Sequence, residues 1–105
     1  MIKVDVFYPN KVGTKFDLNY LCNTHIPLVE QKLGTVLKGV VVEHGLSGGS
    51  PGSQPPYIAI VQLHFETLEA FQTAFAPNAG AIMGDIPNYS DVEPIMQIGE
   101  IKISR

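Results

Sequence analysis

The chain has 105 residues, of which 45% are hydrophobic and 16% charged, a composition typical of one folded domain spanning residues 1–105. Its formal net charge of −3, with no run of Lys or Arg, makes nucleic acid and anionic membranes poor partners, because both bind basic surfaces. The single cysteine, Cys22, cannot form an internal disulfide, which fits a reducing compartment. The sequence has neither a secretion signal nor an apolar stretch of the ~20 residues that span a bilayer. We therefore expect a soluble, cytoplasmic protein.

The first predicted elements are a strand and a helix. Apolar residues alternate with polar ones over residues 2–8, which predicts a strand with one strongly apolar face. Asp17 has the character of a helix N-cap, because its carboxylate can accept hydrogen bonds from the amides that follow. The helix is predicted over residues 18–33, and Gly34 ends it.

This predicted helix carries His25 in the middle of an apolar stripe. At about 100° per residue, Tyr20 lies about 140° away from His25, so a regular helix would keep the two apart and leave Tyr20 at a surface or interface. Cys22 shares the face of His25, which predicts an inert core cysteine rather than a thiolate–imidazole pair. Pro27 falls on the solvent side, where it would bend the helix.

The remaining elements complete the order β-α-β-β-α-β. We predict strands over residues 36–45 and 57–65 around a flexible connector, and a last strand over 95–103. Between the third and the last strand we predict a helix that begins at Thr67 or Glu66 and ends at Pro77, and a short helical turn before Pro87. This order predicts an α+β, ferredoxin-like fold in which a four-stranded antiparallel sheet carries its helices on one face.

The sheet predicts a homodimer. Its helix-free face should be polar in a monomer, yet the third strand carries Ile58 and Ile60 on the face opposite to Ala59 and Val61. An apolar patch of this kind usually marks an interface, and a second copy packed sheet against sheet would cover it. The alternative is that these residues simply lie at the centre of the sheet.

His25 is the best candidate for chemistry. An imidazole on a core-facing stripe needs a partner or a cavity, so it is either a general base in a cleft between helix and sheet or a core histidine satisfied by a backbone carbonyl. An acidic neighbour of Tyr89, such as Asp85, could orient a ring nitrogen of His25.

The other histidines are less informative. His64 could line a pocket at the dimer interface or lie at the sheet edge, and His44 is expected in solvent. We predict no metal site, because the three histidines are widely separated and a single cysteine cannot build a thiolate site. No feature of the sequence predicts a cofactor, although one histidine would be enough to ligate haem.

Two segments resemble a known family. Residues 16–29, FDLNYLCNTHIPLV, are similar to the Asp-x-x-Tyr-x-x-x-x-His-x-Pro-Leu signature of the EthD family, which is named for a protein needed for bacterial degradation of ethyl tert-butyl ether. Residues 85–89, DIPNY, resemble the family's Asp-x-x-Asn-aromatic segment. The resemblance implies a dimeric α+β barrel and makes His25 the motif histidine. The other motif positions map to Asp17, Tyr20, Asp85 and Asn88.

The resemblance implies a role in catabolism or secondary metabolism. Its wider kin include cofactor-free monooxygenases, muconolactone isomerases and haem-dependent proteins. We therefore expect a cofactor-independent oxidoreductase or acid/base catalyst (oxygenation, isomerisation or decarboxylation) that acts on a small apolar or aromatic ligand. His25 would transfer the proton, and the expected substrate-binding residues are Tyr20, His64, Asp85, Asn88 and Tyr89. The alternatives are a ligand-binding accessory protein for a separate oxygenase, and a scaffold without a ligand.

Overall fold

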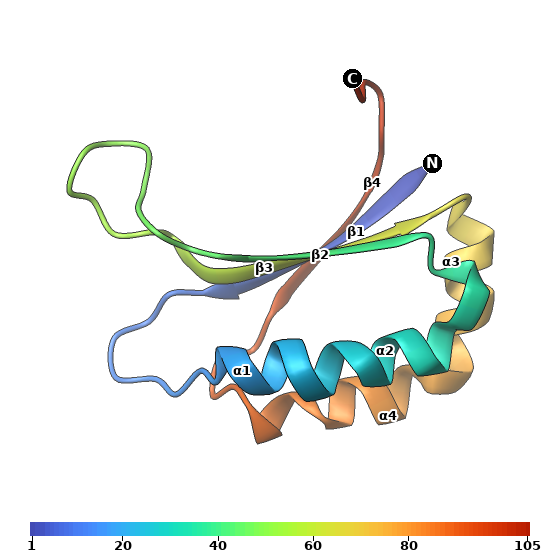
Figure 1. Ribbon diagram of the computed structural model, residues 1–105, viewed down its shortest axis with the longest axis horizontal. Coiled ribbons are helices and arrows are strands. Elements are labelled where there is room, and N and C mark those ends of the chain that lie inside the picture. The colour runs from blue at the N-terminus through green and yellow to red at the C-terminus, as the bar shows by residue number, and fades with distance from the viewer.

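The computed structural model describes residues 1–105 as a four-stranded antiparallel sheet with helices on one face only (Figure 1). The strands are β1 (Ile2–Pro9), β2 (Gly39–His44), β3 (Tyr57–Phe65) and β4 (Ile95–Glu100), in the spatial order β2-β3-β1-β4. The helices are α1 (Leu18–Tyr20), α2 (Ile26–Leu33), α3 (Leu68–Phe75) and α4 (Ala79–Gly84). The predicted α+β, ferredoxin-like fold is therefore confirmed. None of the helices has the length and apolar character needed to cross a bilayer.

The core lies between the sheet and the helices. On the two central strands, alternate side chains point inward, and Val4, Tyr8, Ala59 and Phe65 are all nearly or fully buried. The register pairs Val6 with Val61 on one side and with Met96 on the other, so β4 also contributes side chains to this layer. Alternation along the strands thus gives one continuous apolar floor on which the helices pack.

The first helical segment covers the predicted residues but is not a regular α-helix. Asp17 caps it as predicted, since its Oδ1 accepts from the Tyr20 N–H at 3.0 Å. Between α1 and α2 the chain makes a π-helical turn, Leu21–His25, closed by a hydrogen bond from the Ile26 N–H to the Leu21 carbonyl. Pro27 follows on the exposed side, and the chain leaves the helix at Gly34, whose φ is +62°. This π turn was not predicted.

The second helical segment corrects the prediction that Pro77 ends the helix. Thr67 does cap α3, with its hydroxyl accepting from the Ala70 N–H. After α3 the chain continues through a 3₁₀ turn that contains Pro77 and then through α4 to a further 3₁₀ turn, Ile86–Asn88. Proline is tolerated at the start of a helical turn, where its missing N–H would have no partner in any case.

Two strand boundaries also differ from the predictions. The chain over residues 34–36 forms a 3₁₀ turn, so β2 begins at Gly39 rather than at residue 36. The last strand ends at Glu100 rather than at residue 103, because its antiparallel partner β1 begins at Ile2, opposite Glu100. Beyond it the Ile101 N–H still bonds to the carbonyl of Met1. Residues 101–105 project away from the body of the molecule (Figure 1).

The opposite face of the sheet carries no helix (Figure 1). We call it the outer face. One row is apolar across β3, β1 and β4, where it joins Ile60 to Phe7 and Ile95, the last of these 55% exposed. On β2 the same row ends at Glu43. The next row is polar and joins Asp5 to Gln62 and Gln97. The predicted apolar patch is therefore present, but it is interrupted by polar side chains.

Candidate functional site

The carboxylate of Asp85, at the end of α4, is the centre of a polar cluster beneath the first helical segment. Its Oδ2 lies 2.9 Å from Nδ1 of His25, and its Oδ1 accepts from the Tyr20 hydroxyl at 2.8 Å and from the Asn88 side-chain amide at 2.9 Å. Four residues from two helical segments thus meet at one carboxylate.

The π turn explains how Tyr20 and His25 reach the same carboxylate. In a regular α-helix, residues five apart point about 140° apart, but the wider π turn, which hydrogen-bonds residue i+5 to residue i, brings their directions closer together. Tyr20 and His25 are five apart and enclose this turn. The prediction that the helix would keep them apart is therefore wrong, because it assumed about 100° per residue throughout.

Asp85 is held in its ionised form. Burial raises the pKa of its carboxyl, but the hydrogen bonds from His25, Asn88 and Tyr20 together outweigh that effect and bring the pKa below its ordinary value of 3.8. The same contact works in the opposite direction on its neighbour: the hydrogen bond to Asp85, together with burial, raises the pKa of the Tyr20 hydroxyl. Both groups consequently favour an anionic carboxylate beside a neutral phenol at neutral pH.

An ionised Asp85 determines which nitrogen of His25 carries the hydrogen. A carboxylate can only accept, so Nδ1 of His25 donates to it and Nε2 of the neutral ring is an acceptor. His25 is only 4% exposed, and its Nε2 forms no hydrogen bond within the chain. Only one side-chain N or O atom of the buried and half-buried residues is both inaccessible to solvent and without a hydrogen bond, and that atom is Oδ1 of Asp5. Nε2 of His25 also lacks a hydrogen bond, so it must keep some contact with solvent.

His25 lines a narrow apolar pocket between the helices and the sheet. The pocket has a volume of about 40 Å³, room for a few water molecules. It extends along α2 from His25 to Leu33, a length of about 12 Å at 1.5 Å per residue. Apart from Pro94, every lining residue other than His25 is hydrophobic. The remaining members are Val4, Val6, Tyr8, Ile26, Val29, Val61, Leu63, Phe71, Phe75, Ile82, Met83, Ile86 and Met96.

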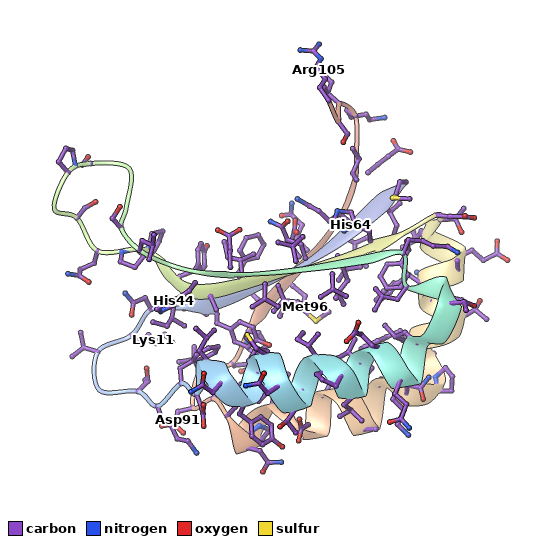
Figure 2. The ribbon with its side chains drawn as sticks, in the orientation of Figure 1. Lys11, His44, His64, Asp91, Met96 and Arg105 are labelled. Atoms are coloured by element: carbon purple, nitrogen blue, oxygen red, sulfur yellow. The ribbon has the colours of Figure 1, made fainter.

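Two methionines lie where this pocket meets solvent. Met83 of α4 and Met96 of β4 both line the pocket and are each 39% exposed. Figure 2 shows Met96 pointing from β4 into the layer between sheet and helices. A wider hollow of about 480 Å³ lies beside the pocket and shares with it Met83, Ile86 and Pro94. The narrow pocket therefore has an outer extension behind flexible side chains.

An aromatic cluster supports the histidine. The fully buried ring of Tyr89 lies with its centroid 4.8 Å from that of His25 and stacks on Tyr20 at 5.7 Å with an interplanar angle of 21°. Its hydroxyl lies 2.7 Å from the hydroxyl of Tyr8 on β1. The imidazole is thus held by a carboxylate at one nitrogen and packs against an aromatic ring tilted by 51°.

The predicted site residues fall into three groups. Tyr20, Asp85, Asn88 and Tyr89 gather around His25, and the expected contact of Asp85 with the ring is present, but none of the four lines the pocket. His64 lies on the outer face, opposite Lys3 in the register, and is not brought to His25 (Figure 2). His44 is exposed as expected, whereas Cys22 is exposed rather than in the core, which corrects that prediction.

The sequence suggested a lining of Leu, Val, Ile and Phe side chains but did not single out four other pocket residues: Tyr8, Met83, Pro94 and Met96. Tyr8 was predicted only as part of the apolar face of a strand. Its hydroxyl, a polar group at the end of an apolar face, is the feature of the sequence that could have indicated a site residue. No group of three or more His, Cys, Asp or Glu side chains is arranged to hold a metal ion.

Comparisons with known proteins agree with this geometry. The sequence model of the EthD domain matches residues 14–93. An EthD-like protein from Ralstonia eutropha JMP134 is 38% identical, with a TM-score of 0.94, over 99% of this chain and 94% of that one. An ethyl tert-butyl ether degradation (EthD) family protein from Bacillus halodurans C-125 is 22% identical, with a TM-score of 0.73, over 96% and 98%.

A more distant similarity concerns the fold alone. A dimeric protein of unknown function with a ferredoxin-like fold, from Bacteroides fragilis NCTC 9343, is 10% identical, with a TM-score of 0.58, over 95% of each chain. No curated protein sequence gives a significant match. The fold is thus that of the ferredoxin-like α+β proteins, which include dimeric relatives. Within that class the chain belongs to the EthD family, because the domain match covers most of its length.

Proposed function

We propose that this protein is a cofactor-independent acid/base catalyst that moves a proton on a small apolar or aromatic substrate, with His25 as the proton-transfer residue. The observation that carries the proposal is the arrangement of the imidazole: Nδ1 is held by an ionised carboxylate, Nε2 has no hydrogen-bond partner in the chain, and His25 lines a pocket. An orienting carboxylate on one ring nitrogen and a free second nitrogen are what a general base requires.

The pocket supports a neutral, largely apolar substrate. Its lining contains no Lys or Arg, so it offers no partner for a carboxylate or phosphate group. The narrow volume admits a flat or slender group, and Met83 and Met96 can change rotamers to enlarge it. Removal of a proton from such a substrate would prepare it for isomerisation, decarboxylation or reaction with oxygen.

The alternative function is that of a ligand-binding accessory protein for a separate oxygenase. The apolar pocket favours this alternative as much as catalysis, because it would bind the same ligands. The Asp85 clamp on His25 distinguishes the two, since a purely apolar carrier gains nothing from an oriented base.

Deuterium exchange tests the proposal. The wild-type protein in D₂O should accelerate exchange at the α-carbon of aromatic ketones such as 2-indanone, measured by proton NMR. His25→Ala should reduce the rate by about 10²–10⁴-fold, which is the usual contribution of a positioned base. Affinity for the ketone should change only a few-fold.

The matched control is His44→Ala, which removes an exposed histidine outside the pocket and should leave the rate unchanged. A His25→Ala variant that exchanges the ketone at the wild-type rate would show that His25 is structural. Binding of the ketone without exchange by the wild-type protein would favour the accessory role.

We also propose that the protein forms a homodimer through the outer face of its sheet. Ile95 and Val41, on the two edge strands, expose 55% and 46% of their surface there, and half-buried Phe7 and Ile60 lie on the central strands. Oδ1 of Asp5 on the same face is buried without a hydrogen bond and has only the ammonium of Lys3 nearby, at 3.5 Å. Structural relatives with this fold are dimeric.

A further inference from the structure

The buried pair of phenols beside His25 leaves one hydrogen unaccounted for. Tyr8 is 2% exposed and Tyr89 is fully buried, and their hydroxyls share a single hydrogen bond of 2.7 Å. Each hydroxyl carries one hydrogen, so the pair has two donors and uses one. Neither hydroxyl forms a second hydrogen bond within the chain. A buried donor without an acceptor is costly, so the second hydrogen needs a place to go.

The pocket decides which phenol carries the free hydrogen. Tyr8 lines the pocket and Tyr89 does not. If Tyr8 donated to Tyr89, the hydrogen of Tyr89 would be sealed in the core without an acceptor. If Tyr89 donates to Tyr8, the hydrogen of Tyr8 can point into the pocket and meet a ligand or water. The second arrangement satisfies both groups.

Tyr8 and His25 then supply all the polar side-chain atoms of the pocket lining. The other lining residues are aliphatic, aromatic or thioether side chains and one proline. An acceptor nitrogen on His25 and a donor hydroxyl on Tyr8 are the two groups needed to remove a proton next to a carbonyl: the base takes the proton, and the donor stabilises the negative oxygen that forms.

We propose that Tyr8 is the oxyanion-stabilising donor of the site and that the substrates are neutral carbonyl compounds with an acidic α-hydrogen. This inference rests on the proposed function and extends it to a substrate class. Nε2 of His25 takes the α-proton as the C–H bond breaks, and the electron pair moves through the new C=C bond onto oxygen. The Tyr8 hydroxyl hydrogen-bonds that oxygen. The imidazolium then returns its proton to the same or a conjugated carbon and the carbonyl re-forms, so no oxidant or reductant is consumed.

Two further features fit a neutral carbonyl substrate. Burial raises the pKa of Tyr8, while its hydrogen bond with Tyr89 opposes this effect, so the phenol keeps its hydrogen and remains a donor at neutral pH. The outer hollow presents the carboxylates of Asp91 and Glu93 and no cation, which disfavours substrates that are already anionic. The charge therefore develops only inside the pocket, next to Tyr8.

Three Tyr→Phe variants test the assignment. Tyr8→Phe should slow deuterium exchange of 2-indanone by about 10²–10³-fold, as expected for loss of one oxyanion donor. Tyr89→Phe should slow it by less than about tenfold, because the Tyr8 hydrogen still points into the pocket. Tyr57→Phe removes a hydroxyl outside the pocket and should have no effect. Circular dichroism and thermal unfolding establish that each variant is folded.

A second readout does not depend on turnover. Absorbance titration with 4-nitrophenolate, a stable oxyanion, should give at least tenfold weaker binding to Tyr8→Phe than to the wild-type protein or to Tyr89→Phe. The assignment is overturned if Tyr8→Phe binds this anion as tightly as the wild-type protein does. Equal losses in Tyr8→Phe and Tyr89→Phe would also overturn it, because they would indicate a merely structural pair.

The two proposals can fail separately. Exchange that depends on His25 but not on Tyr8 would remove the donor assignment and keep the proposed function. Phenolate binding that depends on Tyr8, with no exchange by the wild-type protein, would keep the donor and remove the catalyst.

Discussion

At the scale of single residues, Asp85 is the most informative position in the molecule. One carboxylate accepts hydrogen bonds from Tyr20, His25 and Asn88, and these contacts hold its pKa below the ordinary value. It fixes the tautomer of His25 and so determines which nitrogen is free for chemistry. The histidine could be chosen from the sequence, but its orientation depends on a residue 60 positions away.

We predict that Asp85→Asn abolishes most activity while the fold persists. The amide can no longer stabilise the imidazolium, and its NH₂ group can donate to the histidine and reverse the tautomer. The analogous change in serine protease triads costs about 10⁴-fold in rate. The deuterium-exchange rate of the variant measures the effect, and activity within about threefold of the wild-type value would show that Asp85 does not orient the base.

Asp85 should also give the protein an acid-sensitive stability. Its pKa in the folded state lies below 3.8, so the ionised carboxylate stabilises the fold above that pH, and this contribution is lost as the pH falls below it. The midpoint of thermal unfolding of the wild-type protein should therefore drop between about pH 4 and pH 2 more than that of Asp85→Asn. Glu93→Gln, an exposed carboxylate outside the cluster, is the control and should follow the wild-type curve.

At the scale of secondary-structure elements, the π turn is the feature that builds the site. It places Tyr20 and His25 on one side of a helix that would otherwise separate them. Pro27, which has no N–H, follows one residue after the turn, behind Ile26, and removes one donor from the regular hydrogen-bond ladder there. The first helical segment therefore lacks the regular α-helical hydrogen-bonding pattern at the turn, and this irregularity directs the side chains of Tyr20 and His25 to one carboxylate.

Deletion of Thr24 tests this role. Removing one exposed residue from the π turn should restore a regular α-helix and rotate α1 by about 100° relative to His25. Tyr20 would then lose its contact with Asp85, and the exchange rate should fall at least tenfold, at a cost of about 1–3 kcal/mol in stability.

The matched variant is Thr24→Ala, which keeps the length of the turn and should behave as the wild-type protein does. A crystal structure of the deletion variant in which Tyr20 still donates to Asp85 would contradict the role assigned to the turn.

At the scale of the whole molecule, the two faces of the sheet differ in what covers them. The inner face and the helices enclose the pocket, whereas the outer face is free of helices (Figure 1). His64, Lys3 and Asp5 lie on the outer face and are not part of the pocket. The proposed dimer would use this outer face and leave the opening of the pocket, near Met83 and Met96, on the other side of the sheet.

We predict that Ile60→Glu makes the protein monomeric. The substitution places a carboxylate in the central apolar row of the outer face, and in a twofold dimer it introduces a charge from each subunit. An uncompensated buried charge costs about 3–5 kcal/mol, enough to raise the dissociation constant more than a hundredfold. Light scattering coupled to size-exclusion chromatography gives the mass directly.

Leu46→Glu is the control for this prediction. Leu46 is 87% exposed in the connector after β2, so the same change in charge should leave the mass unaltered. A wild-type protein that elutes as a monomer at micromolar concentration would refute the proposed dimer.

The sequence alone determined the order of elements, the fold class, the inward position of His25 and the family motif. These follow from local physics: strands need alternating apolar residues, and caps such as Asp17 and Thr67 satisfy the amides next to them. Errors began where a regular period was assumed, at the π turn and at Pro77.

Only the tertiary structure decided the chemistry of the site. The contact of His25 with Asp85 and the pairing of Tyr8 with Tyr89 join residues 60 and 81 positions apart. Such contacts depend on how the helices and the sheet pack. The amino-acid sequence alone specifies neither the distance between two side chains nor their rotamers. Which phenol carries the free hydrogen likewise depends on which ring borders the pocket, and that is a property of packing rather than of order along the chain.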